Sequence, residues 1–144
     1  SSDVCSSDLE QAPILFCGDT LFSAGCGRLF EGTPAQMLDS LSKLARLPDD
    51  TRVCCAHEYT TSNLKFARAI EPDNPELLAY TQEVQVLRSH NRPSLPSSIA
   101  REKAINPFMR SHLAGVVAAV KGFDPSAHTP QEIFGALRAW KNQF

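Results

Sequence analysis

The chain has 144 residues, of which 42% are hydrophobic and 21% are charged, proportions that are typical of a folded globular protein and argue against disorder. This length suits one domain, or the end of one domain with a small neighbour. The net charge is −2 without a long run of basic residues, and no apolar stretch approaches the about 18 residues of a membrane-spanning helix, so we expect neither nucleic acid nor a membrane as a partner.

The first residues differ in character from the rest of the chain. Residues 1–9 repeat Ser-Ser-Asp and show neither helical nor strand periodicity. We interpret residues 1–10 as a non-native leader, with an ordinary flexible terminus as the alternative. The five cysteines of the chain are odd in number and form no Cys-x-x-Cys pair, a pattern that favours reduced thiols in a cytoplasmic protein.

Residues 11–59 have the pattern of a mixed α/β segment. The apolar residues 13–17 do not alternate with polar ones, which predicts a strand covered on both faces. A glycine-containing loop follows. A capping-box pattern that begins at Thr33, with proline at the first helical position, predicts a helix that ends near Arg46. A second strand is expected at residues 52–56.

From residue 60 onward the pattern changes to helices separated by prolines, without a convincing further strand. The prolines within residues 92–97 favour an extended connector, because the residue before a proline disfavours the helical conformation. Apolar spacing and capping residues predict helices at residues 61–70, 75–89, 98–104, 113–120 and 129–140. Residues 60–144 therefore form an all-helical part.

Two side chains of the kind that bind metals directly follow the two predicted strands. Asp19 comes after the first strand and His57 after the second. A carboxylate and an imidazole can both bind a metal such as zinc, although a catalytic zinc usually has three protein ligands. Taken singly, Asp19 is more typical of a turn and His57 of a structural residue at a strand end. Together they indicate part of a metal site.

Five segments of the chain, in this order, resemble the glyoxalase II (hydroxyacylglutathione hydrolase) family. They are Gly-Asp-Thr-Leu-Phe-Ser-Ala-Gly-Cys-Gly-Arg at 18–28, Ala-His-Glu-Tyr-Thr at 56–60, Asn-Leu-Lys-Phe-Ala at 63–67, Asn-Pro-Phe-Met-Arg at 106–110 and Arg-Ala-Trp-Lys-Asn-Gln-Phe at 138–144. The resemblance extends over residues 12–144. It implies an α+β fold class, in which the C-terminal part of a metallo-β-lactamase αββα sandwich (residues 11–59) is followed by an all-helical substrate-binding domain (residues 60–144).

The resemblance also implies a reaction. Members of the family are thioester hydrolases that convert S-D-lactoylglutathione to D-lactate and glutathione, in the detoxification of methylglyoxal. By motif match, Asp19 bridges two divalent metals (zinc, or else iron or manganese) and His57 binds one of them, so both residues are catalytic as well as metal-binding. Two metals about 3.5–4 Å apart generate a bound hydroxide near neutral pH, and this hydroxide would attack the thioester carbonyl.

The substrate-binding residues that the resemblance implies would face glutathione and its two carboxylates. They are Arg28, Phe30, Tyr59, Arg138 and Lys141. A spacing of three residues places Arg138 and Lys141 on one face of the last helix; the alternative is a solvated basic face near a helix C-terminus. Some relatives have tyrosine in place of Phe30 and lysine in place of Arg28, which removes a hydroxyl and changes the geometry of a cation.

The family's remaining metal ligands, a His-x-His-x-Asp-His cluster and one further histidine, have no counterpart before Gly18. His90, His112 and His128 are interpreted as solvated residues. We therefore predict a truncated, inactive fragment of a protein that is a cytoplasmic monomer when complete. One alternative is a non-catalytic helical module that binds glutathione conjugates or packs on a partner chain. Another is a different metallo-β-lactamase-fold hydrolase, such as a sulfur dioxygenase or a phosphodiesterase, which the basic helical end disfavours.

Overall fold

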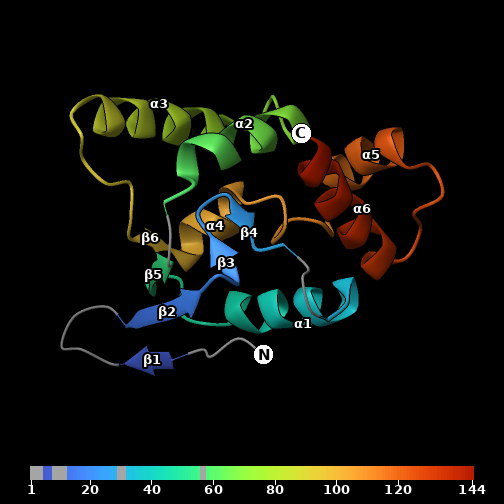
Figure 1. Cartoon of the computed structure of the whole chain (residues 1–144), viewed down its shortest axis with the longest axis horizontal. Coiled ribbons are helices and arrows are strands. Elements are labelled where there is room, and N and C mark those ends of the chain that lie inside the picture. Colours follow the sequence, from blue (N-terminus) through green and yellow to red (C-terminus); the bar gives the residue numbers. More distant parts are fainter. Residues whose placement is uncertain (1–4, 8–12, 29–31, 56–57) are drawn as a thin grey trace.

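The computed structural model describes residues 5–7, 13–28, 32–55 and 58–144, and it shows a small α/β part followed by helices (Figure 1). The strands are β1 (Cys5–Ser7), β2 (Ile14–Gly18), β3 (Leu21–Phe22), β4 (Gly25–Cys26), β5 (Arg52–Cys55) and β6 (Ser97–Ser98). The helices are α1 (Pro34–Ala45), α2 (Thr60–Ile70), α3 (Pro75–Ser89), α4 (Ile99–Ile105), α5 (Ala114–Phe123) and α6 (Pro130–Gln143). This order confirms the predicted α+β class. No helix among the described residues is both long enough and apolar enough to cross a membrane.

Four strands form one sheet in the order β1-β2-β5-β6. The central strands β2 and β5 are parallel, whereas β1 and β6 pair antiparallel at the two edges. Because parallel strands end at the same edge of a sheet, the C-terminal ends of β2 and β5 lie side by side, and such an edge is where ligands bind in many α/β proteins. The pairing therefore places Asp19, which follows β2, at this edge of the sheet.

Two strands of this sheet were not predicted. β6 begins at Ser97, inside the connector that was expected to be merely extended, and it pairs with β5. β1 lies at residues 5–7, in the segment interpreted as a leader without strand periodicity, and it pairs with β2. Both strands are too short to contain an alternating pattern, so pairing with a neighbour decides their conformation and sequence periodicity does not reveal it.

The predicted helix caps are found, with one difference. At α1 the Thr33 hydroxyl accepts a hydrogen bond from the Gln36 amide (3.2 Å), and the Thr33 amide donates to the Gln36 side chain (2.9 Å). At α6 the Thr129 hydroxyl accepts from the Glu132 amide (3.1 Å), but the Glu132 carboxylate accepts from the amide of His128. The capping box is therefore complete at α1, and only its hydroxyl half is present at α6.

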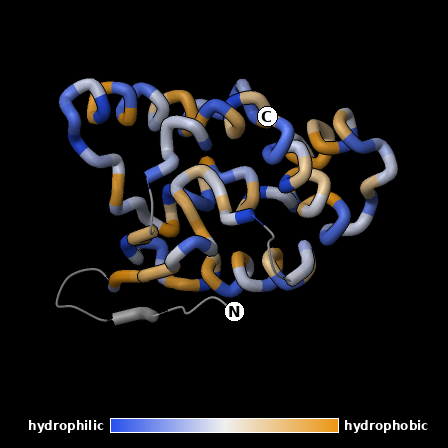
Figure 2. The backbone as a smooth tube through the Cα atoms, in the orientation of Figure 1, coloured by the Kyte–Doolittle hydropathy of each residue, from blue (hydrophilic) through white to orange (hydrophobic). Residues whose placement is uncertain are grey.

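One hydrophobic core joins the strands to the helices. Leu15 of β2 and Val53 of β5 are fully buried against the same cluster as Phe66, Phe108 and Phe134 of the helical part. The rings of Phe66 and Phe108 stack with their centroids 6.2 Å apart, and Phe134 packs edge-on against Phe108 at 5.7 Å. Hydrophobic and hydrophilic residues alternate along the helices (Figure 2), as amphipathic packing on this core requires.

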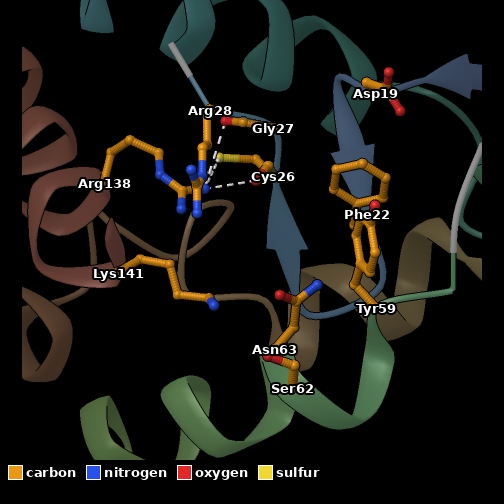
Figure 3. Close-up of a pocket in the computed structure, with 10 residues that line it drawn as sticks. All are labelled: Asp19, Phe22, Cys26, Gly27, Arg28, Tyr59, Ser62, Asn63, Arg138 and Lys141. Atoms are coloured by element: carbon orange, nitrogen blue, oxygen red, sulfur yellow. Dashed lines mark hydrogen bonds between the residues drawn. The ribbon is translucent and has the colours of Figure 1, made fainter. Parts of the chain in front are cut away.

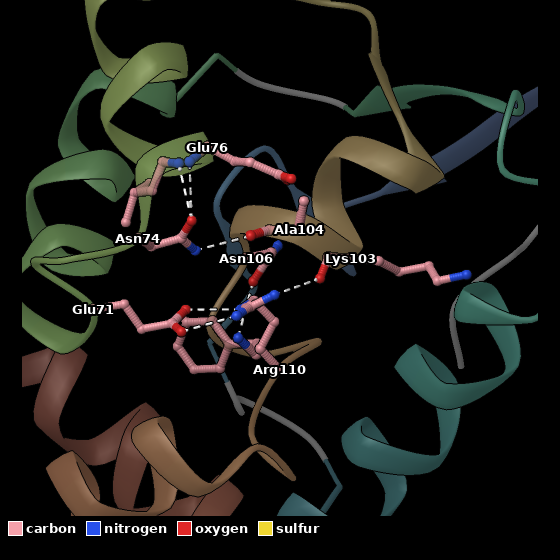
Figure 4. A network of polar contacts seen from close by, with 9 residues as sticks. Glu71, Asn74, Glu76, Lys103, Ala104, Asn106 and Arg110 are labelled. Atoms are coloured by element: carbon pink, nitrogen blue, oxygen red, sulfur yellow. Dashed lines mark hydrogen bonds and ion pairs between the residues drawn. The ribbon is translucent and has the colours of Figure 1, made fainter.

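A network of polar contacts fixes the segment around α4 to the turn between α2 and α3 (Figure 4). Arg110 donates to both carboxylate oxygens of Glu71, from Nε (2.7 Å) and from Nη2 (2.9 Å). Asn74, which caps α3, donates from Nδ2 to the carbonyl of Ala104 (2.9 Å). A two-bond arginine–carboxylate pair restricts orientation as well as distance. The α4 region is therefore held firmly against the helices that flank it.

The described cysteine side chains agree with the prediction of reduced thiols. Cys17 and Cys26 are buried, Cys54 and Cys55 are half-buried, and all four are free. Burial raises the pKa of the Cys17 thiol to about 12 and that of the Cys26 thiol to about 11. Because the thiolate is the reactive form of cysteine, these two thiols are chemically inert at neutral pH.

Candidate functional site: a pocket beside the glycine-rich hairpin

The glycine-rich segment after β2 is a short hairpin rather than the loop that the sequence predicted. β3 and β4 pair antiparallel, and Ala24 at the turn has a φ of 62°. After β4 the chain passes close to its own earlier segment: a Cβ on Gly27 would lie 2.0 Å from the carbonyl oxygen of Asp19. Only glycine permits this approach. The hairpin thereby brings Asp19 and Arg28 to the same side of the molecule.

A pocket of about 460 Å³ opens beside this hairpin (Figure 3). Its walls come from the end of β2, the hairpin, the start of α2 and the end of α6. The lining residues are Asp19, Phe22, Cys26, Gly27, Arg28, Tyr59, Ser62, Asn63, Arg138 and Lys141. Every predicted site residue that the structure describes is among them. The other two, Phe30 and His57, lie outside the described residues.

The pocket has two chemically different ends. Asp19 lies at one end, and Arg138 and Lys141 lie at the other (Figure 3). Between them, Phe22 packs edge-to-face against Tyr59 with ring centroids 5.1 Å apart, and Tyr59 is 50% exposed. A carboxylate end and a basic end are thus joined by an aromatic wall.

Arg138 has a different environment from the one predicted. Only 5% of it is exposed, and it donates from Nη1 to the carbonyl of Cys26 (2.6 Å) and from Nη2 to the side chain of Asn142 (3.1 Å). Its Nε is buried without a hydrogen-bond partner. Arg138 therefore attaches α6 to the hairpin, and it adds a buried positive charge to the wall of the pocket.

The basic end is electrostatically unbalanced within the described part of the chain. No described carboxylate forms an ion pair with Arg28, Arg138 or Lys141. Burial lowers the pKa of Lys141 from its usual value, and repulsion from Arg138 and Arg28 lowers it further. Three cations that repel one another around a half-open pocket favour an anionic ligand.

The acidic end supplies a single carboxylate. Among the described residues, no three His, Cys, Asp or Glu side chains lie close enough together to hold a metal ion. His90, His112 and His128 are exposed and do not line the pocket, as predicted for solvated residues. Asp19 is a suitable ligand type, but a catalytic zinc has three protein ligands. The described residues alone do not fit a metal centre.

Five of the lining residues were not among the predicted site residues, namely Phe22, Cys26, Gly27, Ser62 and Asn63. Ser62 and Asn63 lie in the first turn of α2, directly after Tyr59. Asn63 is buried, and its Nδ2 donates to the carbonyl of Ser23 at the hairpin turn (3.1 Å). Ser62 and Asn63 follow Tyr59 by three and four positions at the start of a helix. This spacing indicates that their side chains share a face with Tyr59.

Comparisons with known proteins match the whole chain in two parts. A model described as "Hydroxyacylglutathione hydrolase C-terminus" matches residues 58–144, and a model of the metallo-beta-lactamase superfamily matches residues 1–57. A hydroxyacylglutathione hydrolase of Albidiferax ferrireducens is 64% identical over 96% of this chain and 54% of its own length. A hydroxyacylglutathione hydrolase of Cupriavidus taiwanensis is 59% identical over 94% of this chain and 51% of its own length. Another, of Nitrosomonas europaea, is 53% identical over 90% of this chain and 50% of its own length. The chain thus spans about half the length of the curated relatives that it matches.

Proposed function

The chain belongs to the hydroxyacylglutathione hydrolase family, and we propose that its pocket binds the glutathione part of a thioester substrate for hydrolysis. The match to the metallo-beta-lactamase superfamily and the observed order of elements bear out the predicted fold class, the C-terminal part of a metallo-β-lactamase fold followed by a helical domain. One observation carries the proposal: residues from four separate segments meet in one pocket that has a carboxylate at one end and cations at the other.

The chemistry of glutathione fits this arrangement. Its two terminal carboxylates would lie at the basic end, where Arg28 and Lys141 can donate charge-assisted hydrogen bonds. Arg138 adds positive potential from its buried position. The aromatic wall of Phe22 and Tyr59 would contact the central cysteine of the ligand, and the sulfur of that cysteine, which bears the acyl group, would extend toward Asp19. The pocket therefore binds and orients a thioester.

Membership of this family implies the use of divalent metal. We propose two ions, zinc or else iron or manganese, with Asp19 as the bridging carboxylate and His57 as a ligand of one ion. When bound, such a pair supplies an activated water molecule and an electrophile for the thioester carbonyl. The chain's own described residues hold the substrate in place. In this proposal residues 11–59 contribute to the metal end, and residues 60–144 form the substrate-binding domain.

The substrate that we propose is S-D-lactoylglutathione, which yields D-lactate and glutathione and serves the detoxification of methylglyoxal. The free thiols of the described residues fit a reducing compartment, and we propose the cytoplasm. The printed names of the relatives support a hydroxyacylglutathione as the substrate class. We propose that the complete protein acts as a monomer.

Isothermal titration of the 144-residue chain with S-methylglutathione tests the pocket assignment without the complication of a free thiol. Binding in the millimolar range or tighter is expected. S-methylglutathione diethyl ester, with both terminal carboxylates blocked, is the matched control and should bind at least about tenfold more weakly, the difference expected from one lost charge-assisted hydrogen bond. Absence of heat with millimolar S-methylglutathione, or equal binding of the diester, would overturn the proposal.

Binding should weaken at alkaline pH before an ordinary lysine loses its proton. The pKa of Lys141 is lowered by burial and by Arg138 and Arg28, so its charge, and the attraction to a ligand carboxylate, is lost on raising the pH through that lowered value. The measurement is the affinity for S-methylglutathione from about pH 7 to about pH 10. The variant Lys141→Arg should shift the decline to higher pH, because arginine stays charged. A decline at the same pH in both proteins would contradict the assignment.

The 144-residue polypeptide is predicted to bind substrate without turning it over. Asp19 and His57 are fewer than the three ligands of a usual catalytic zinc site. The purified chain, with zinc added, should hydrolyse S-D-lactoylglutathione no faster than buffer does, whereas the relative from Albidiferax ferrireducens serves as the positive control. Turnover by the chain at a rate comparable to that of the relative would disprove the prediction.

A further inference from the structure

Glu102 of α4 is a fully buried carboxylate, with 0% of its surface exposed. Burial raises the pKa of this carboxyl group, and neutral hydrogen-bond donors oppose the rise. No cation of the described residues forms an ion pair with it. Burying an acid without a cationic partner is costly unless hydrogen bonds satisfy it fully. A residue that only filled space at this position would be apolar. The burial of a carboxylate here therefore points to the hydrogen bonds that it accepts.

Four donors converge on Glu102, and two of them belong to the turn of the β3–β4 hairpin. The Ala24 amide donates to Oε1 (2.7 Å), and the Ser23 hydroxyl donates to Oε2 (3.0 Å). On the other side, the Ser97 hydroxyl donates to Oε2 and Asn106 Nδ2 donates to Oε1 (3.0 Å). The carboxylate thus connects the hairpin turn to β6 and to the end of α4.

Other side chains of the helical part bind the same hairpin through its backbone. Asn106 Nδ2 also lies within hydrogen-bonding distance of the carbonyls of Phe22 (3.2 Å) and Gly25 (2.9 Å). The Glu102 carboxylate accepts from the Ala24 amide and the Ser23 hydroxyl at the hairpin turn, and the Ser23 hydroxyl also contacts the Tyr80 hydroxyl (2.9 Å). The strands of this hairpin are two residues each, too short to be stable by their own pairing. Their position therefore depends on these contacts.

The hairpin in turn carries one wall of the pocket. Phe22 and Cys26 line the pocket from its two strands, and Gly27 and Arg28 follow directly. A shift of the turn would move the aromatic wall and the Arg28 cation together. We propose that Glu102 is a positioning residue for glutathione binding, whose buried carboxylate fixes the hairpin that presents Phe22 and Arg28 to the ligand. This inference rests on the proposed function of the pocket.

Three variants separate geometry from charge. Glu102→Gln keeps an oxygen for the Ala24 amide, while its new NH₂ group can donate to the hydroxyls of Ser23 and Ser97, which accept as readily as they donate. Glu102→Met keeps the length and removes every acceptor. Glu102→Asp keeps the charge but is one methylene too short. Val116→Ala, a cavity variant at a buried position in α5, serves as a control that loses stability without altering the hairpin.

The affinity for S-methylglutathione and the melting temperature are measured for each protein. Glu102→Met and Glu102→Asp should bind at least about tenfold more weakly than the parent chain, as for one misplaced charge-assisted hydrogen bond. Glu102→Gln should bind within about threefold of it. Val116→Ala should retain affinity despite a lower melting temperature. If Glu102→Met does not fold, the difference in affinity between Glu102→Asp and Glu102→Gln tests the inference. Parental affinity in a folded Met or Asp variant would overturn the inference.

Amide NMR spectra keep the inference separate from the proposed function. In the absence of ligand, Glu102→Asp should shift the amide resonances of Gly25, Gly27 and Arg28, and Glu102→Gln should shift them less. If the parent chain binds no glutathione, the proposed function fails and these shifts alone decide the positioning role. Unchanged resonances at Gly27 and Arg28 in the Asp variant would then refute it.

Discussion

Removing two cations from the basic end of the pocket, with Arg28→Ala and Lys141→Ala combined, is expected to weaken glutathione binding about 100-fold. A hydrogen bond to a charged group contributes roughly 1.5–3 kcal/mol, which is about tenfold or more in affinity for each cation. Arg28 is exposed and Lys141 is half-buried, so both can reach a carboxylate without displacing protein contacts. Titration calorimetry with S-methylglutathione measures the loss.

Lys121→Ala is the control for net charge, and it removes one positive charge where the double variant removes two. Lys121 lies in the last turn of α5, is exposed and does not line the pocket, so its removal changes the net charge without changing the site. Its affinity should stay within about twofold of the parent value, because long-range charge effects are screened at physiological salt. Equal losses in the control and in the double variant would show that net charge attracts the ligand and that the pocket does not bind it specifically.

Phe108→Ala is expected to lower the free energy of unfolding by about 3–5 kcal/mol, the usual range for truncating a buried phenylalanine. Phe108 is 1% exposed, it packs against Phe66 and Phe134, and the Arg138 guanidinium lies 5.2 Å from its ring centroid. The variant removes a large ring from the centre of the core. Urea unfolding measures the change, and the melting temperature should fall by about 10 °C.

Val86→Ala is the matched control for this truncation. Val86 lies in α3 and is 60% exposed, so the variant should unfold within about 0.5 kcal/mol of the parent, as surface substitutions usually do. A small effect at Phe108 would mean that the aromatic cluster is not part of the cooperative core, and the connection between the strands and the helices would need another source of stability.

Sequence patterns predicted most of the long elements because those elements have periodicity and caps. The capping residue Thr33 predicted the start of α1. The apolar spacing of residues 75–89 predicted α3, and the bounds of this helix are as predicted. The β3–β4 hairpin and β6 are two-residue strands, which contain no period to detect. Tertiary contacts, above all those of Glu102 and Asn106, decide their conformation.

The sequence predicted several residues of the candidate site, but it did not predict how their side chains are arranged. Motif resemblance brought together Asp19, Arg28 and Lys141, which do meet in one pocket. The burial of Arg138 was not predictable, because its carbonyl partners Cys26 and Gly27 lie more than a hundred positions away in the chain. Spacing along a helix shows which side chains share a face, but it does not show what that face contacts.

Glutathione binding in this pocket is tested directly by mapping the residues that respond to the ligand. Amide resonances of the ¹⁵N-labelled chain are followed while S-methylglutathione is added, and the residues that shift are assigned. We expect saturable shifts confined to the pocket, with Gly27, Arg28, Ser62 and Lys141 among the largest. Shifts centred elsewhere, such as on α3 or α5, or no saturable shift at millimolar ligand, would contradict it.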